Sequence, residues 1–114
     1  MKALTTETEG STAVAVGYSA LEAQNMGTGT ANYNVAVGYK AGEAVTTAVN
    51  NTLIGGLSGD AITTGSNNTA LGKSSLSAMT TGDSNVAIGI SALASDTLGA
   101  RNIAIGVGAL DTQN

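Results

Sequence analysis

A short motif recurs at a nearly fixed period, and this period restricts the possible folds more than any other feature of the chain. Each copy has three residues, apolar or threonine, closed by a glycine; the copies occupy residues 14–17, 35–38, 52–55, 69–72, 86–89 and 103–106. The closing glycines lie 21, 17, 17, 17 and 17 residues apart. A helix-pair repeat needs about 33 residues or more, so this period excludes helical solenoids. The sequence therefore predicts a stack of short, equivalent turns.

Each copy has the pattern of a short β-strand. In most copies β-branched residues flank an alanine, and the glycine ends the run. Clusters of Thr, Gly, Ser, Asp and Asn, such as residues 63–67 and 80–84, lie between copies and are typical of turns. We therefore predict an all-β fold, namely a parallel β-solenoid (β-roll) of about six 17-residue coils, where a coil is one turn of the solenoid.

Two columns of equivalent residues are expected to be structural. A glycine after every strand suits a corner that needs a positive φ angle or a close approach of backbones. An asparagine precedes five of the six strands, so its side chains would form hydrogen bonds along the stack, as amide ladders do. The structural repeat residues are therefore Gly17, Gly38, Gly55, Gly72, Gly89, Gly106, Asn34, Asn51, Asn68, Asn85 and Asn102.

The repeat divides the chain into two parts. Residues 12–114 form the solenoid domain, and residues 1–11, which we match to no copy, are expected to be an N-terminal segment or cap. The first repeat carries four extra residues within Gln24 to Tyr33. These should form an outward loop near 24–33, because inserting them into the stack would break its register. Since the sequence stops within a coil at Asn114, we expect it to be part of a longer chain.

Both faces of the predicted strands are apolar. Side chains alternate across a strand, so the first and third positions share one face and the middle position lies on the other. A strand that is apolar on both faces is usually buried on both, whereas one coil supplies only one interior. We therefore predict a homo-oligomer in which small side chains permit close approach around a symmetry axis. The expected contact face is Ala15, Ala36, Leu53, Ala70, Ala87 and Ala104.

Composition excludes several classes of function. The 114 residues include no His and no Cys, which excludes zinc or copper sites built on these ligands and hydrolases with a histidine base. The formal charge of −4 opposes binding to nucleic acid or to anionic membranes. Apolar runs are too short for a membrane-spanning helix. We expect a protein that is not an enzyme, has no catalytic residue, metal site or cofactor, and neither binds nucleic acid nor inserts into membranes.

An acidic column follows the glycines by five residues. We interpret it as a solvated stripe, because like charges stacked about 5 Å apart repel unless solvent or a cation screens them. Its members are Glu22, Glu43, Asp60 and Asp111.

A threonine column supports an alternative function. Regular threonine arrays on flat solenoid faces resemble those of ice-binding proteins, but such arrays need threonine at alternate strand positions. Here a second threonine follows directly at most of these positions, within a turn-like context. Ice binding is therefore the alternative, and it would use Thr46, Thr63, Thr80 and Thr97.

The complete repeat resembles those of known fibres. The unit N-[TV]-A-[VIL]-G, followed by A-L and T-T-G-x-N-N, looks like the repeats of phage tail fibres and related viral fibre proteins. It is also similar to the shorter N-S-V-A-I-G repeat in the heads of trimeric autotransporter adhesins. The resemblance covers about residues 12–114.

This resemblance implies an intimate homotrimeric rod that supports or displays a surface for a host carbohydrate or protein receptor. It implies a location in a virion tail fibre, with the bacterial cell surface as the alternative. It transfers no catalytic or receptor-binding residue to this chain. A segment that only trimerises and spaces other domains remains an open alternative.

Overall fold

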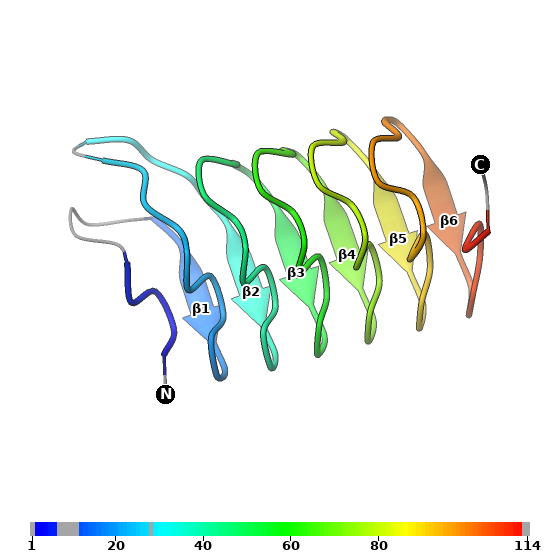
Figure 1. Ribbon diagram of the computed structural model, residues 1–114, viewed down its shortest axis with the longest axis horizontal. Coiled ribbons are helices and arrows are strands. Elements are labelled where there is room, and N and C mark those ends of the chain that lie inside the picture. Colours follow the sequence, from blue (N-terminus) through cyan, green and yellow to red (C-terminus); the bar gives the residue numbers. More distant parts are fainter. Residues whose placement is uncertain (1, 7–11, 28, 113–114) are drawn as a thin grey trace.

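The chain folds into a single-sheet β-solenoid (Figure 1). The computed structural model describes residues 2–6, 12–27 and 29–112. Its strands are β1 (Val14–Val16), β2 (Val35–Val37), β3 (Thr52–Ile54), β4 (Thr69–Leu71), β5 (Val86–Ile88) and β6 (Ile103–Ile105). They pair in parallel in the order β1-β2-β3-β4-β5-β6, which gives five full turns between the first strand and the last. The prediction of an all-β parallel solenoid is confirmed. The described residues form no helix that could cross a membrane.

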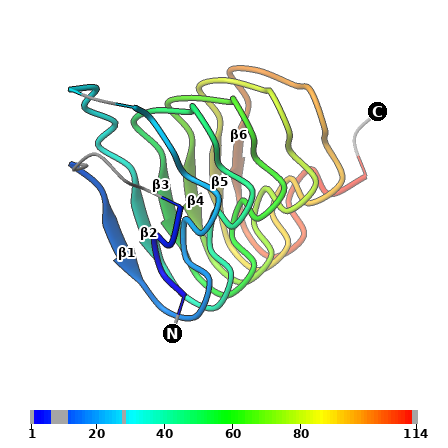
Figure 2. The same ribbon diagram turned by 60° about the vertical axis from the view of Figure 1, so that its left-hand side comes forward.

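The strand register reproduces the sequence period. Ala36 pairs with Ala15 on one side and with Leu53 on the other, so equivalent residues lie directly above one another. The four extra residues of the first repeat do not shift this register. They are taken up in the connection between β1 and β2, which extends beyond the other coils in Figures 1 and 2.

Glycine ends each strand because the coils approach too closely there for a side chain. Gly38 has a φ of 139°, and a Cβ atom built on it would lie 2.6 Å from the carbonyl oxygen of Gly55. Gly55 stands in the same relation to Gly72. The corner therefore needs glycine both for its backbone conformation and for the spacing between coils.

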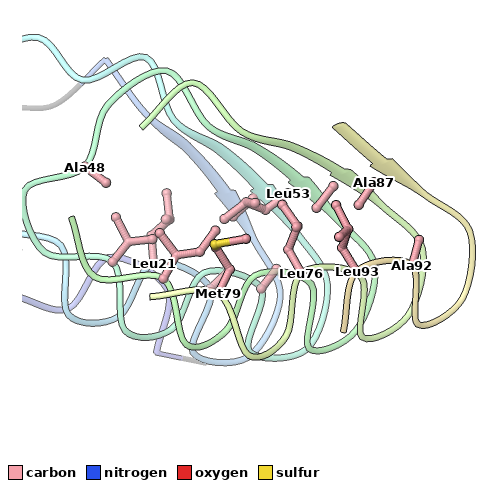
Figure 3. Close-up of a cluster of buried hydrophobic side chains, with 14 of the residues drawn as sticks. Leu21, Ala48, Leu53, Leu76, Met79, Ala87, Ala92 and Leu93 are labelled. Atoms are coloured by element: carbon pink, nitrogen blue, oxygen red, sulfur yellow. The ribbon is translucent and has the colours of Figure 1, made fainter. Parts of the chain in front are cut away.

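The hydrophobic core is a narrow file of side chains along the solenoid axis (Figure 3). Leu76 and Leu93 fill it at the position four residues after the corner glycine. In the β2 and β3 coils that position is Gly42 or Gly59, and Leu53 from the strand occupies the space instead. A Cβ atom on either glycine would lie 2.8 Å from a methyl group of Leu53. One leucine in the strand thus replaces two in the turns.

The repeat begins earlier than the sequence analysis placed it. Ala3 and Leu4 pack against the core, 17 residues before Ala20 and Leu21. The Leu4 N–H donates to the Ala20 carbonyl at 3.1 Å, the same bond that Leu21 makes to Ala41. Residues 2–6 therefore form part of a further coil over β1, while residues 1 and 7–11 of the expected N-terminal segment lie outside the described residues.

Candidate functional site

The inner and outer faces of the sheet are the reverse of those predicted. The middle residues of β2 to β5 are fully buried inside the coil, Ala104 is 2% exposed, and Ala15 packs against the core. The prediction that Ala15, Ala36, Leu53, Ala70, Ala87 and Ala104 form a contact face between chains is therefore wrong. The physical reason is the width of the coil, whose interior accommodates mostly alanine beside the strand, so the larger side chains point outward.

The outward face of the sheet is the candidate functional surface. Its first strand positions are Val14, Val35, Thr52, Thr69, Val86 and Ile103, and its third positions are Val16, Val37, Ile54, Leu71, Ile88 and Ile105. Exposure is 53% at Val16, 45% at Leu71 and 67% at Ile105. None of the residues in these two columns is charged. Apart from Thr52 and Thr69 the two columns are aliphatic, and an exposed, mostly apolar face of this kind on a small protein indicates an interaction surface.

A rim of side chains follows the corner glycines along one edge of this face. In chain order the rim is Tyr18, Tyr39, Gly56, Lys73, Ile90 and Val107. The rings of Tyr18 and Tyr39 stack with centroids 5.8 Å apart and planes 15° apart. The Lys40 ammonium lies 5.8 Å from the Tyr39 centroid and 3.2 Å from the Glu43 carboxylate. The hydrogen bond and negative charge of Glu43 raise the pKa of Lys40.

The asparagine column is structural and buried. The Asn51 side-chain oxygen accepts the backbone N–H of Asn68 at 2.9 Å, and the Asn51 amide donates to the Gly65 carbonyl at 2.9 Å. The same two bonds recur along the stack at Asn34, Asn68 and Asn85. These asparagines therefore hold coils together and are not exposed to a ligand.

The first coil has alanine instead of asparagine, so Asn34 forms its hydrogen bonds on that side with other residues. The Asn34 N–H donates to the side chain of Asn32 at 3.0 Å, and the Asn34 amide donates to Gln24 at 2.9 Å. Both partners come from the extended first connection and are fully buried. Part of the extra length is therefore used to satisfy buried polar groups.

The acidic column is paired with lysines toward the N-terminal end of the stack. Glu22 lies 3.8 Å from Lys2, and Glu43 is bound to Lys40. One oxygen of Asp60 is buried without a hydrogen-bond partner, and burial, with a smaller contribution from the charge of Glu43, raises the pKa of Asp60. Within the described residues, no cluster of three or more acidic side chains could hold a metal ion.

The threonine column uses its hydroxyl groups along the stack. The hydroxyls of Thr46, Thr63 and Thr80 donate to backbone carbonyls of the next coil at 3.0–3.2 Å. These donors are therefore engaged within the protein, and the column gives no support to ice binding.

A shallow depression of about 450 Å³ lies along the connection between β5 and β6, over residues 95–100 and Asn102. Its carboxylate, Asp96, accepts the N–H of Gly99 at 2.8 Å and the side-chain amide of Asn102 at 3.2 Å. The polar groups of this depression are thus engaged in a local turn.

The fold defines the chain as a β-solenoid repeat protein. Comparisons with known protein families, with curated proteins and with solved structures gave no match. The functional argument accordingly rests on the chain's own surfaces, chiefly on the outward face of the sheet and its rim.

Proposed function

We propose that this chain is a non-enzymatic structural module of a fibre or adhesin, and that it assembles as a homotrimer through the outward face of its sheet. The trimer would support or display a binding site for a host-surface carbohydrate or protein. We assign it to a virion tail fibre, with the bacterial cell surface as the alternative. The proposed mechanism needs no cofactor, because a rigid rod carrying identical surfaces can bind through avidity alone.

The observation that carries the proposal is the exposure of large aliphatic side chains along the whole sheet. The strands follow one another along the long axis of the molecule, which measures 38 Å (Figure 1). A standard interface takes about 800 Å² from each partner, and the exposed surface of this chain totals 5226 Å². Because the outward face extends over all six successive strands, covering it requires a partner as long and as regular as the solenoid, which a second copy supplies.

A second argument comes from charge. Identical chains repel where like charges meet, but the two outward strand columns carry none. The resemblance of the repeat to those of phage tail fibres and trimeric adhesin heads supports three copies in preference to two.

Light scattering coupled to gel filtration tests the proposal. The native chain should have the mass of three chains, and Leu71→Lys should have the mass of one, because a lysine would be buried at the centre of the interface. Thr81→Lys is the matched control, since it adds the same charge at an exposed turn residue and should remain trimeric.

Circular dichroism on the same samples separates dissociation from unfolding. If Leu71→Lys loses its β signal, the milder Ile54→Thr should give a folded chain whose trimer dissociates at higher concentration than the native one. A native chain that is monomeric and stable would overturn the proposal, and thermal hysteresis measurements would then test ice binding.

A further inference from the structure

The rim beside the outward face is interrupted at one coil. Every coil except one places a side chain at the position after the corner glycine, and the β3 coil has Gly56 there. Its neighbours along the rim are Tyr39 in the β2 coil and Lys73 in the β4 coil. The rim therefore has a recess one coil wide, with an aromatic ring on one side and an ammonium group on the other.

The fold does not require glycine at this position. Equivalent residues in other coils include tyrosine, lysine and isoleucine, so the backbone accepts a side chain here. A Cβ atom built on Gly56 would meet a single atom within 4 Å, the Tyr39 carbonyl oxygen at 4.0 Å, whereas one on Gly55 would lie 2.6 Å from the Gly72 carbonyl. Gly55 is therefore needed for packing, while Gly56 leaves space.

The recess is wide enough to hold one six-membered ring. The coils of Tyr39 and Lys73 are two strand spacings apart, about 9.5 Å, which leaves room for a six-membered ring in contact with both sides. Tyr18, in the preceding coil, stacks on one face of the Tyr39 ring, so the opposite face is directed away from Tyr18, on the side of the Gly56 coil. Tyr39 is 54% exposed, and the Lys40 ammonium, 5.8 Å from the ring centroid, is not in close contact with the ring.

The lysines beside the recess indicate which chemical groups a bound ligand should carry. Lys40, next to Tyr39, is neutralised by Glu43 at 3.2 Å. In the described part of the chain Lys73 takes part in no ion pair, and it is exposed at the far side of the recess. An unpaired lysine in the coil beyond Gly56 and an exposed aromatic ring in the coil before it suit a ligand with an apolar C–H face and a carboxylate at its edge.

We infer that the recess at Gly56 binds a pyranose residue bearing a carboxylate, with its C–H face on Tyr39 and its carboxylate at Lys73. This inference rests on the receptor-binding part of the proposed function and names its ligand class. Each chain has one such recess, so an assembly of several chains would bind acidic glycans through repeated weak contacts.

The experiment is an NMR titration of the ¹⁵N-labelled native assembly with methyl β-D-glucuronide, compared with the neutral methyl β-D-glucoside. A single sugar on one ring should bind with a Kd on the order of 1–10 mM. The amide signals of Gly56 and Lys73 should shift with the glucuronide, and the glucoside should bind at least about tenfold more weakly because it lacks the charged contact.

Three variants complete the test. Gly56→Val fills the recess with a side chain that other coils tolerate, and it should abolish the shifts without changing mass or β signal. Tyr39→Ala and Lys73→Gln should each weaken binding by about tenfold. Val107→Ala, on the same rim but away from the recess, is the matched control and should bind as the native chain does.

The inference is overturned if Gly56→Val binds as the native chain does, if the shifts lie elsewhere, or if both sugars bind equally. Light scattering on the same samples distinguishes this failure from that of the proposed function. A trimer that binds neither sugar overturns the glycan site alone, whereas a monomer overturns the assembly.

Discussion

At the scale of single residues, the solenoid is governed by the volume available inside each coil. The exchange between Leu53 and the glycines at 42 and 59 illustrates this, because a leucine enters the core from the strand where the turns supply none. In these two coils the large side chain that fills the core comes from the strand and not from the turn. Core packing at near-crystalline density makes such an exchange necessary.

This exchange predicts that two single substitutions each lower stability and that the double variant restores part of it. Leu53→Ala should lower the free energy of unfolding by about 2–5 kcal/mol, since it leaves a cavity beside two glycines. Gly59→Leu alone should also destabilise, because its side chain would overlap those of Leu53 and Ile62. The double variant should recover at least half of the loss, as leucine occupies the equivalent position with a φ near 54° at Leu76. Urea unfolding of the four proteins measures the coupling, and additive losses would contradict the exchange.

Asp60 predicts a pH dependence of stability. Its pKa in the folded chain is raised above the ordinary value of 3.8, by burial first and then by Glu43. The folded state therefore holds this proton to a higher pH than the unfolded state does. The destabilisation is absent well below pH 3.8 and develops as the pH rises through the raised pKa.

Asp60→Asn should accordingly be more stable than the native chain at pH 7 and equal to it at pH 3. Urea midpoints at the two pH values check this. Asp83→Asn is the comparison, because Asp83 is exposed and its Oδ1 accepts the Ser66 N–H at 2.7 Å, so removing its charge should not stabilise the chain. A variant that is less stable at pH 7 would show that the carboxylate is favoured in the fold.

At the scale of the element, the coil is held to its neighbours by backbone ladders and by the buried asparagines. Each asparagine joins three segments, because it bonds to the next asparagine and to the following turn. A coil has few large apolar contacts of its own, so these polar bonds decide whether successive coils stay in register. Solenoids of this kind gain stability chiefly from contacts between neighbouring repeats.

The ladder predicts a difference between its middle and its last member. Asn68→Ala removes acceptor and donor groups that the adjacent coils use, and each buried group left unpaired costs about 1–3 kcal/mol. Asn102→Ala is the matched comparison, because this residue is partly exposed and its amide bonds to Asp96 within its own connection. Hydrogen exchange should show the larger loss of protection for Asn68→Ala, around β4 and β5. Equal effects would mean that the ladder does not join coils.

The sequence was sufficient to predict the coils but not which face of the strand lies inside. A repeated motif forces equivalent residues into columns, so the glycine corner and the asparagine column could be expected from spacing alone. Alternation within the strand separates two faces without saying which one is buried. That choice follows from the turns, where residues such as Leu21, Lys40 and Asn67 adopt positive φ angles and bend the coil tightly. Leucine and lysine seldom adopt this conformation, so their identity did not indicate it, whereas asparagine adopts it more readily.

The sequence did contain signals that were overlooked. Ala3 and Leu4 stand 17 residues before Ala20 and Leu21, which matches the repeat period beyond the six motifs. The absence of a side chain at Gly56 was equally visible, but it gained meaning only when the structure showed that this glycine is not needed for the backbone conformation.

At the scale of the whole molecule, the proposed assembly would link stability to association through the outward face. Because the middle strand positions are already buried inside the coil, the aliphatic residues on the other face can be covered only by something outside the chain. If that partner is a second and third copy, folding and association draw on the same apolar surface. The apparent stability then depends on protein concentration.

The proposed assembly therefore predicts a melting temperature that rises with concentration. Differential scanning calorimetry of the native chain over a hundredfold range should show this rise, because dilution favours the dissociated state. Folded Ile54→Thr should melt at a lower temperature. A native melting temperature that is independent of concentration would separate folding from association and argue for a solenoid that is stable alone.

Because equivalent residues stack in register, the length of the solenoid is set by its number of repeats. In the described chain, strand contacts join only successive strands, and β4 and β6 both have alanine at the middle position and a large aliphatic residue at the third. Deleting residues 86–102 would bring β4 directly against β6 and shorten the rod by one strand spacing, about 4.8 Å. Insertion or loss of a single repeat unit would thus change the length of the molecule in fixed steps while keeping the register of the remaining coils.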